Sequence, residues 1–197
     1  MFTPKEFNLP EVEGISKKTL DEHLKLYQGY VKHANLIQEK INEYKTDPDK
    51  NAYVLGELSR RFAFEFDGMR NHEYYFEQLE GGQKSVSMDS ALSKKMIEDF
   101  GSVEKWLEEF KLLCMTRGIG WAVLWYDKTS NKLINAWVDE QHLGQLNGLS
   151  FIYGIDMWEH SYLLDYTPGE KKKYVESFLS ATNQEVSEER FARATKI

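Results

Sequence analysis

One long stripe of apolar residues constrains the fold most. Across residues 15–44, apolar side chains recur every three or four positions: Ile15, Leu20, Leu24, Tyr27, Val31, Ala34, Ile37 and Ile41. This spacing places them on one face of an α-helix that has to bury that face. Ser16 is a suitable N-cap. A break at 45–51, which contains Pro48, separates this helix from a second helical pattern over 52–79. The two predict an antiparallel helical hairpin.

The pattern changes after a linker at 81–88. Helices are predicted over 90–100 and 103–117, with Ser102 as the second N-cap. Strand patterns follow at 121–127, 132–138 and 149–155, and helices from Met157, from Pro168 and near Glu188. The predicted fold class is therefore α+β: an N-terminal antiparallel helical hairpin, then a C-terminal α/β domain with a three-stranded antiparallel sheet. We expect domains at 1–82 and 83–197.

Composition narrows the function classes. A formal net charge of −7 disfavours nucleic acid as a partner, and the run 171–173 of lysines is expected to be a solvated helix face. Cys114 is the single cysteine, so no disulfide can form within the chain; we expect it in the core and the protein in the cytoplasm. The N-terminus lacks a signal-peptide pattern and no window is long enough to span a membrane, so no membrane partner is expected.

Polar residues gather directly after the apolar run 149–155. Asp156 and His160 lie four apart, so one helical turn could bring both side chains to one point. Taken alone, they are as readily an N-capping Asp and an ordinary helical His. His23, early in the first helix, can face His72, late in the second. Together the four residues suggest a metal site with three nitrogens and one oxygen.

These segments resemble a known family. "DMWEHSYLLDY" (156–166) is similar to the D-x-W-E-H-x-Y signature of the iron/manganese superoxide dismutases. "ISKKTLDEH" resembles the opening of that family's first helix, and "NHEYYFEQL" resembles its second. "FGSVEKWLEEF", "GIGWAVLWYD" and "TNQEVSEERF" resemble later family segments. The resemblance covers nearly the whole chain, in order.

The resemblance implies a metal site and a reaction. It assigns as ligands His23, His72, Asp156 and His160, with a solvent molecule as the fifth ligand. One manganese or iron ion per subunit would convert superoxide to dioxygen and hydrogen peroxide. Imidazole and carboxylate ligands suit both metals. His33 is left over and is expected at the surface.

Residues around the ligands bear on which metal is used. In the family, a glutamine hydrogen-bonds the solvent ligand. Iron-type members place it on the second helix at the position of Gly68, and manganese-type members place it near the strands, where Gln141 stands. The resemblance therefore favours manganese, or tolerance of both metals. His142 takes this role if the alignment shifts by one. Trp121 and Trp158 would line the pocket and exclude bulk water.

The chain departs from the family in its first helix. Members read roughly H-x-x-x-H-H-x-x-Y, whereas "HLKLYQGY" is one residue shorter and lacks the second histidine. Tyr27 takes roughly the place of that histidine, and Tyr30 is expected to act as the gateway tyrosine. Leu163 replaces a tyrosine that normally contacts the missing histidine across the dimer interface. Because a helix rotates about 100° per residue, the shorter spacing leaves the position of Tyr30 open.

The resemblance also implies assembly. Glu159 would reach the partner subunit and hydrogen-bond its His160, as in the family's homodimer; a tetramer remains an alternative. Arg70 and Lys25 are candidates for steering the superoxide anion. Two rival interpretations stay open. One is a dismutase-fold metalloprotein with a different redox or hydrolytic activity, and the other is an inactive binding or scaffold member.

Overall fold

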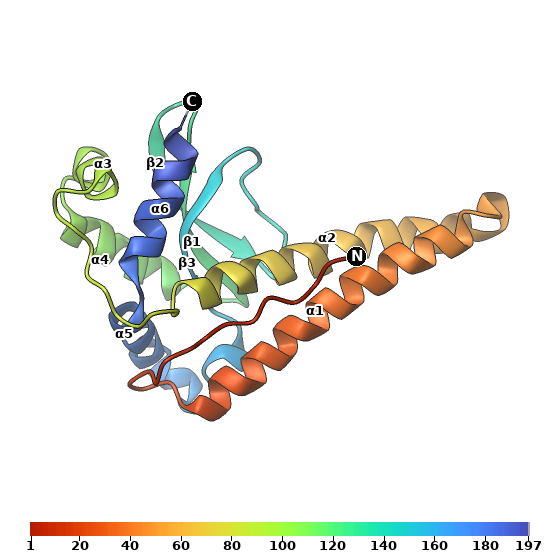
Figure 1. Ribbon diagram of the computed structural model, residues 1–197, viewed down its shortest axis with the longest axis horizontal. Coiled ribbons are helices and arrows are strands. Elements are labelled where there is room, and N and C mark those ends of the chain that lie inside the picture. The colour runs from red at the N-terminus through yellow and green to blue at the C-terminus, as the bar shows by residue number, and fades with distance from the viewer. Residues whose placement is uncertain (197) are drawn as a thin grey trace.

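The first two helices form the predicted hairpin. The computed structural model describes residues 1–196. Helix α1 (Lys17–Tyr44) and helix α2 (Pro48–Glu77) run side by side in opposite directions (Figure 1). The side chain of Ser16 caps α1 by accepting from the Thr19 N–H, as predicted. Helix α2 begins earlier than the apolar pattern suggests, because Pro48 occupies its first turn, where a missing N–H costs nothing.

Two short helices precede the sheet. Helix α3 (Ala91–Phe100) and helix α4 (Val103–Cys114) are capped by the side chains of Ser90 and Ser102. Gly101 ends α3 in the left-handed region, with φ of 90°, where a residue without a Cβ is favoured. The helix predicted to reach residue 117 ends at Cys114, which is fully buried, as expected.

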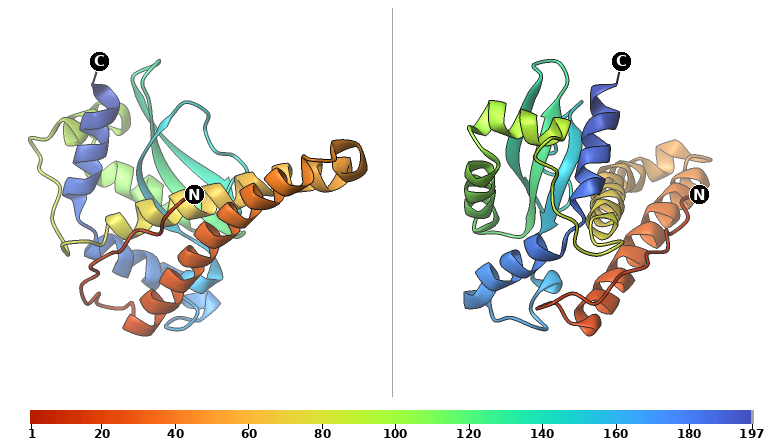
Figure 2. Two further views of the ribbon diagram at one scale, coloured as in Figure 1. Left: turned by 45° about the vertical axis from the view of Figure 1, so that its right-hand side comes forward. Right: turned by 60° about the vertical axis from the view of Figure 1, so that its left-hand side comes forward.

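Three strands form one antiparallel sheet between layers of helices. Strands β1 (Gly120–Asp127), β2 (Lys132–Asp139) and β3 (Ser150–Asp156) pair antiparallel in the order β2-β1-β3. Trp121 of β1 pairs with Asp156 of β3. Helices α3 and α4 cover one side of the sheet, and α2 and α6 (Gln184–Thr195) cover the other (Figure 2). The α+β class and the three-stranded sheet are thus confirmed.

The predicted helix from Met157 is wrong. Only a 3₁₀ turn, η1 (Glu159–Ser161), forms there. The Asp156 carboxylate accepts from the Trp158 N–H at 2.7 Å, and this local bond bends the chain before an α-helical turn can start. A second 3₁₀ turn, η2 (Pro168–Glu170), leads into α5 (Lys171–Ala181). The helix expected near Glu188 is α6.

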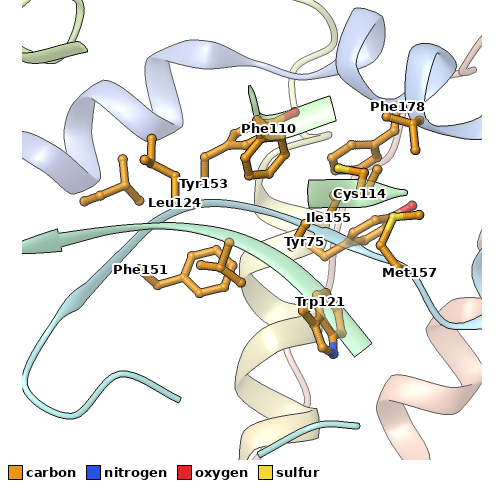
Figure 3. Packing of buried hydrophobic residues seen from close by; sticks show 14 of the residues in the cluster. Tyr75, Phe110, Cys114, Trp121, Leu124, Phe151, Tyr153, Ile155, Met157 and Phe178 are labelled. Atoms are coloured by element: carbon orange, nitrogen blue, oxygen red, sulfur yellow. The ribbon is translucent and has the colours of Figure 1, made fainter. Parts of the chain in front are cut away.

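The hydrophobic core joins the hairpin to the second half. Tyr75 of α2 stacks on Phe178 of α5 with ring centroids 4.6 Å apart, and both are buried beside Trp121 and Met157 (Figure 3). Tyr153 and Phe110 continue the core between β3 and α4. Within residues 1–196, no helix is long and apolar enough to cross a membrane.

Candidate metal centre

Four side chains from four elements converge at one buried point. The Asp156 Oδ2 lies 3.0 Å from the His23 Nε2, 3.6 Å from the His72 Nε2 and 3.1 Å from the His160 Nε2. All four atoms lie within 4.8 Å of one another. His23, His72 and Asp156 are fully buried, and the side chain of His160 is 22% exposed. The structure therefore brings together the four residues predicted as ligands.

Local structure fixes how each carboxylate oxygen of Asp156 is used. Its Oδ1 accepts from the Trp158 N–H, which leaves Oδ2 facing the three imidazoles. The Tyr174 hydroxyl and the Ser161 hydroxyl both donate to the Asp156 backbone carbonyl, at 2.8 and 3.0 Å. These bonds hold the end of β3 and the following turn, η1, which places His160 beside Asp156. The sequence did not point to Tyr174 and Ser161, because both act through hydrogen bonds to a backbone carbonyl, which residue patterns do not reveal.

The histidine tautomers test whether a metal ion fits. The His72 Nδ1–H donates to the Gly68 carbonyl at 2.6 Å, so its Nε2 carries a lone pair rather than a proton. That Nε2 is buried and has no hydrogen-bond partner. A buried acceptor without a partner costs free energy, and a cation at the cluster removes that cost. Three imidazoles and one carboxylate are a suitable donor set for iron or manganese.

The charges of the cluster agree with this fit. Burial lowers the pKa of His23 and, more strongly, that of His72, so these rings are neutral near pH 7 and can donate lone pairs. Burial alone would raise the pKa of Asp156. The neighbouring His160 and His23 outweigh burial and hold that pKa below its usual value. The buried carboxylate is therefore ionised, and a cation would balance its charge.

A chain of hydrogen bonds leads from the sheet to α1 beside His72. The Trp121 indole N–H donates to the Gln141 Oε1 at 2.9 Å. The Gln141 Nε2 donates to the Tyr30 hydroxyl at 3.0 Å. The rings of Trp121 and Tyr30 lie 5.1 and 4.9 Å from that of His72. Both ends of the Gln141 amide are thus engaged, and its orientation is fixed.

The shorter spacing in α1 explains why Tyr30 reaches this chain. Helix α1 is unbroken from Lys17 to Tyr44. Seven residues in a regular helix rotate by about 700°, so Tyr30 lies within about 20° of the His23 direction. Eight residues would leave it about 80° away. The missing residue therefore keeps the tyrosine and the histidine on one face without any irregularity in the helix.

Gly68 makes room for the tyrosine ring. A Cβ added at Gly68 would lie 2.6 Å from the Tyr30 Cδ1 and 2.7 Å from its Cε1. Any larger side chain at this position requires the ring to move. The Tyr30 ring therefore fills the space beside Gly68, four residues before His72. The amide near the ligands comes instead from Gln141, in the segment after β2.

Other predicted residues lie outside this chain. The His142 ring packs edge-on to Phe64 at 5.6 Å, so Gln141 and not His142 joins the hydrogen-bonded chain. The Tyr27 hydroxyl accepts from the Lys5 N–H at 2.8 Å and donates to Glu73 at 3.2 Å. Tyr27 thus faces the N-terminal segment rather than the ligand atoms.

The outer face of His160 is partly apolar. The Trp158 ring stacks on His160 at 5.8 Å, and its indole N–H donates to the Glu140 carbonyl at 3.0 Å. A small cavity of about 380 Å³ is lined by seven side chains: Lys18, Glu22, Leu26, Glu159, His160, Leu163 and Leu164. This lining includes Leu26 of α1 but not Tyr27.

The expected steering cations are already paired. The Arg70 guanidinium donates to Glu73 at 2.6 Å, and the Lys25 ammonium donates to Glu22 at 2.7 Å. Each positive charge therefore has a carboxylate beside it, which weakens its attraction for an approaching anion. His33 is exposed on α1, as predicted.

Comparison with known proteins gives a consistent result. A family model described as "Iron/manganese superoxide dismutases, C-terminal domain" matches residues 88–190. Superoxide dismutase [Fe] of Aquifex pyrophilus is 33% identical over 98% of this chain and 92% of its own length. Mitochondrial superoxide dismutase [Mn] of Glossina morsitans morsitans is 34% identical over 92% and 83%. Superoxide dismutase [Fe] of Cupriavidus metallidurans is 32% identical over 94% and 93%. With this site and this similarity along its length, the chain belongs to the iron/manganese superoxide dismutase family.

Proposed function

We propose that this chain is a superoxide dismutase whose single iron or manganese ion is held by His23, His72, Asp156 and His160. The observation that carries the proposal is the buried convergence of three imidazole nitrogens and one carboxylate oxygen within 4.8 Å. When bound, the ion supplies the alternating one-electron chemistry that converts two superoxide anions and two protons to dioxygen and hydrogen peroxide. Family membership supports the same reaction.

We assign four side chains around the ligands to the control of protons and water. Burial raises the pKa of the Tyr30 phenol, so the hydroxyl stays protonated near neutral pH. Because this hydroxyl accepts from the Gln141 Nε2, its own hydrogen is left to donate to a peroxide anion in the pocket. Gln141 orients that hydroxyl through its Nε2. Trp121 is fully buried and closes the inner wall, which keeps bulk water out. We assign Trp158 the same shielding role beside His160.

We infer that manganese is the favoured metal, with tolerance of iron as the alternative. Gly68 offers no amide from α2, and the Tyr30 ring fills the space above it. Gln141 brings its amide from the segment after β2, which is the manganese-type arrangement that the resemblance implies. The relatives are named for iron in some cases and manganese in others at nearly equal identity, so identity does not separate the two metals.

Metal loading with direct kinetics tests this proposal. The metal-free protein is loaded separately with manganese and with iron, and superoxide decay is followed at matched occupancy. Fast decay with manganese and slow decay with iron is the expected result. Equal rates would overturn the manganese preference, and rates no faster than free ions at full occupancy would overturn the activity. His72→Ala should lose the metal, whereas His33→Ala, an exposed histidine of α1, should retain it.

We also propose that the protein forms a homodimer through the outer face of His160. Glu159 is exposed there, and Leu163 and Leu164 are 42% and 50% exposed. A second copy would cover these leucines and bring Glu159 to the imidazole of His160 of the partner subunit. Light scattering should give twice the monomer mass, and four times that mass would indicate a tetramer. Leu163→Glu should yield monomers, whereas Leu112→Glu, on exposed α4 surface, should not. A monomeric wild-type protein would refute the dimer.

Two further assignments are proposals of the same kind. We propose that residues 1–82 and 83–197 are separate domains with the metal site between them. Limited proteolysis should then cut first within 83–89, where most residues are exposed.

We propose a cytoplasmic location. Cys114 is the single cysteine, so no disulfide can form within the chain, and it is buried as a free thiol.

A further inference from the structure

The ligand set is divided between the two halves of the chain. His23 and His72 belong to the hairpin, whereas Asp156 and His160 belong to the second half. The distance between the two ligand pairs therefore depends on how α2 is held against β3. Metal sites tolerate displacements of only about 0.5 Å before ligand geometry suffers. Contacts that lock α2 to β3 are thus candidates for setting the site.

Gln78 makes a two-point connection between these elements. It follows the last residue of α2 and is fully buried. Its Nε2 donates to the Gly154 carbonyl at 2.7 Å, and its Oε1 accepts from the Gly154 N–H at 2.9 Å. Gly154 lies two residues before Asp156, and Gln78 lies six residues after His72. One side chain therefore links the ends of two rigid segments that each carry a ligand.

Arg190 of α6 completes the connection. It is 5% exposed, and its Nη1 donates to the Gln78 Oε1 at 3.2 Å and to the Ile152 carbonyl at 3.4 Å. Its Nη2 donates to the Tyr74 carbonyl at 2.9 Å and to Glu77 at 2.8 Å. The rigid fork of a guanidinium fixes several acceptors at once. We call Gln78 and Arg190 together the clamp.

The surroundings of the clamp show why polar bonds matter here. An open cleft of about 1160 Å³ is lined by residues of α2, β3 and α6, and Tyr74, Glu77 and Arg190 form part of its wall. Tyr74 also stacks on Phe151 of β3 with ring centroids 4.5 Å apart. Stacked rings can slide over one another at little cost, whereas hydrogen bonds depend steeply on distance and angle. The clamp therefore supplies the directional part of this contact.

We propose that Gln78 and Arg190 are positioning residues that set the geometry of the metal site, an inference that rests on the proposed function. They touch no ligand atom and act through the α2 and β3 backbones. Their loss lets the two ligand pairs shift relative to each other, which weakens the hold on the ion before the protein unfolds. The expected signature is faster metal release than global stability alone explains.

The test compares metal release with unfolding in full-length, manganese-loaded protein. Gln78→Met keeps the length of the side chain and removes both bonds to Gly154. Trp106→Phe is the matched control, because the Trp106 N–H donates to Asn135 at 3.1 Å wholly within the second half. Urea unfolding of the metal-free forms gives the stability of each variant. Transfer of manganese to a chelator gives the release rate, and electron paramagnetic resonance of bound Mn²⁺ reports ligand symmetry.

We expect Gln78→Met to release manganese at least tenfold faster than wild type and to change the Mn²⁺ spectrum. Trp106→Phe should stay within about twofold of wild type in release, at comparable loss of stability. Arg190→Lys, which keeps the positive charge but loses the fork of the guanidinium, provides a milder variant if Gln78→Met does not fold. Equal release from clamp and control variants of equal stability would overturn the inference alone. A wild-type protein that binds no manganese or iron would overturn the proposed function and the clamp with it.

Discussion

Replacing Gly68 with alanine tests the packing of Tyr30 directly. An alanine inside a helix is ordinarily more stable than glycine by about 1 kcal/mol. At Gly68 the new Cβ would lie 2.6 Å from the Tyr30 ring, so the ring has to retreat by about 0.8 Å to reach an ordinary 3.4 Å contact. A retreat of the same size directed away from Gln141 would stretch the 3.0 Å bond between the Gln141 Nε2 and the Tyr30 hydroxyl to about 3.8 Å, beyond hydrogen-bonding distance.

Whether Gly68→Ala lowers or raises the free energy of unfolding shows whether Tyr30 packs against this glycine. Overpacking costs about 1–3 kcal/mol, and a lost hydrogen bond costs about 1 kcal/mol. After the helix gain, Gly68→Ala should lower the free energy of unfolding by about 1–3 kcal/mol and slow superoxide decay at unchanged metal content. Gly56→Ala is the matched control, since that α2 glycine has no atom within 4 Å of an added Cβ; it should raise stability by about 1 kcal/mol. Urea unfolding measures both. A stabilised Gly68→Ala protein would show that Tyr30 does not pack there.

Three further outcomes follow from the site and its surroundings. Gln141→Leu leaves the buried Trp121 N–H without an acceptor, so it should cost about 1–3 kcal/mol in urea unfolding and slow superoxide decay while metal content, measured by mass spectrometry, stays constant. Burial raises the pKa of Asp67 to about 6, so the folded protein loses stability as pH rises through 6 and this buried carboxyl ionises. Asp67→Asn should therefore gain about 1 kcal/mol in free energy of unfolding over wild type at pH 8 and little at pH 4. An equal gain at both pH values would contradict this. Adding manganese at a thousandfold excess over its Kd should stabilise the metal-free protein by about 4 kcal/mol, and an unchanged melting temperature would argue against a buried site.

Local sequence signals were sufficient for most of the fold. The stripe of α1 and the predicted serine caps Ser16 and Ser102 act within a few residues, and the structure confirms each. The three strands also follow their predicted segments closely. The failure at residues 157–163 arose because an apolar and aromatic segment resembles a helix. Its actual turn depends on the bond from the Trp158 N–H to the Asp156 carboxylate, which spacing alone does not reveal.

The four ligand residues could be predicted from the sequence, whereas the residues that hold them in place could not. His23 and His72 could be placed opposite each other by hairpin geometry, and the structure brings their rings to 4.9 Å. The Gln141 amide that links Trp121 to Tyr30 could be proposed only through the resemblance. Gln78 and Arg190 were not identified at all, because their roles come from bonds to distant backbone groups: Gly154 lies 76 positions from Gln78, and Tyr74 lies 116 positions from Arg190.

The wide spacing of the ligands has a consequence for biosynthesis. His23 and His72 emerge from the ribosome long before Asp156 and His160, and the two early histidines alone offer a metal only half of the site. While only the hairpin has been translated, its two histidines lack the carboxylate of Asp156. Arg190 is made later still. The complete set of four ligands therefore exists only once residue 160 has been translated, so neither manganese nor iron can be fully coordinated until most of the chain has been made.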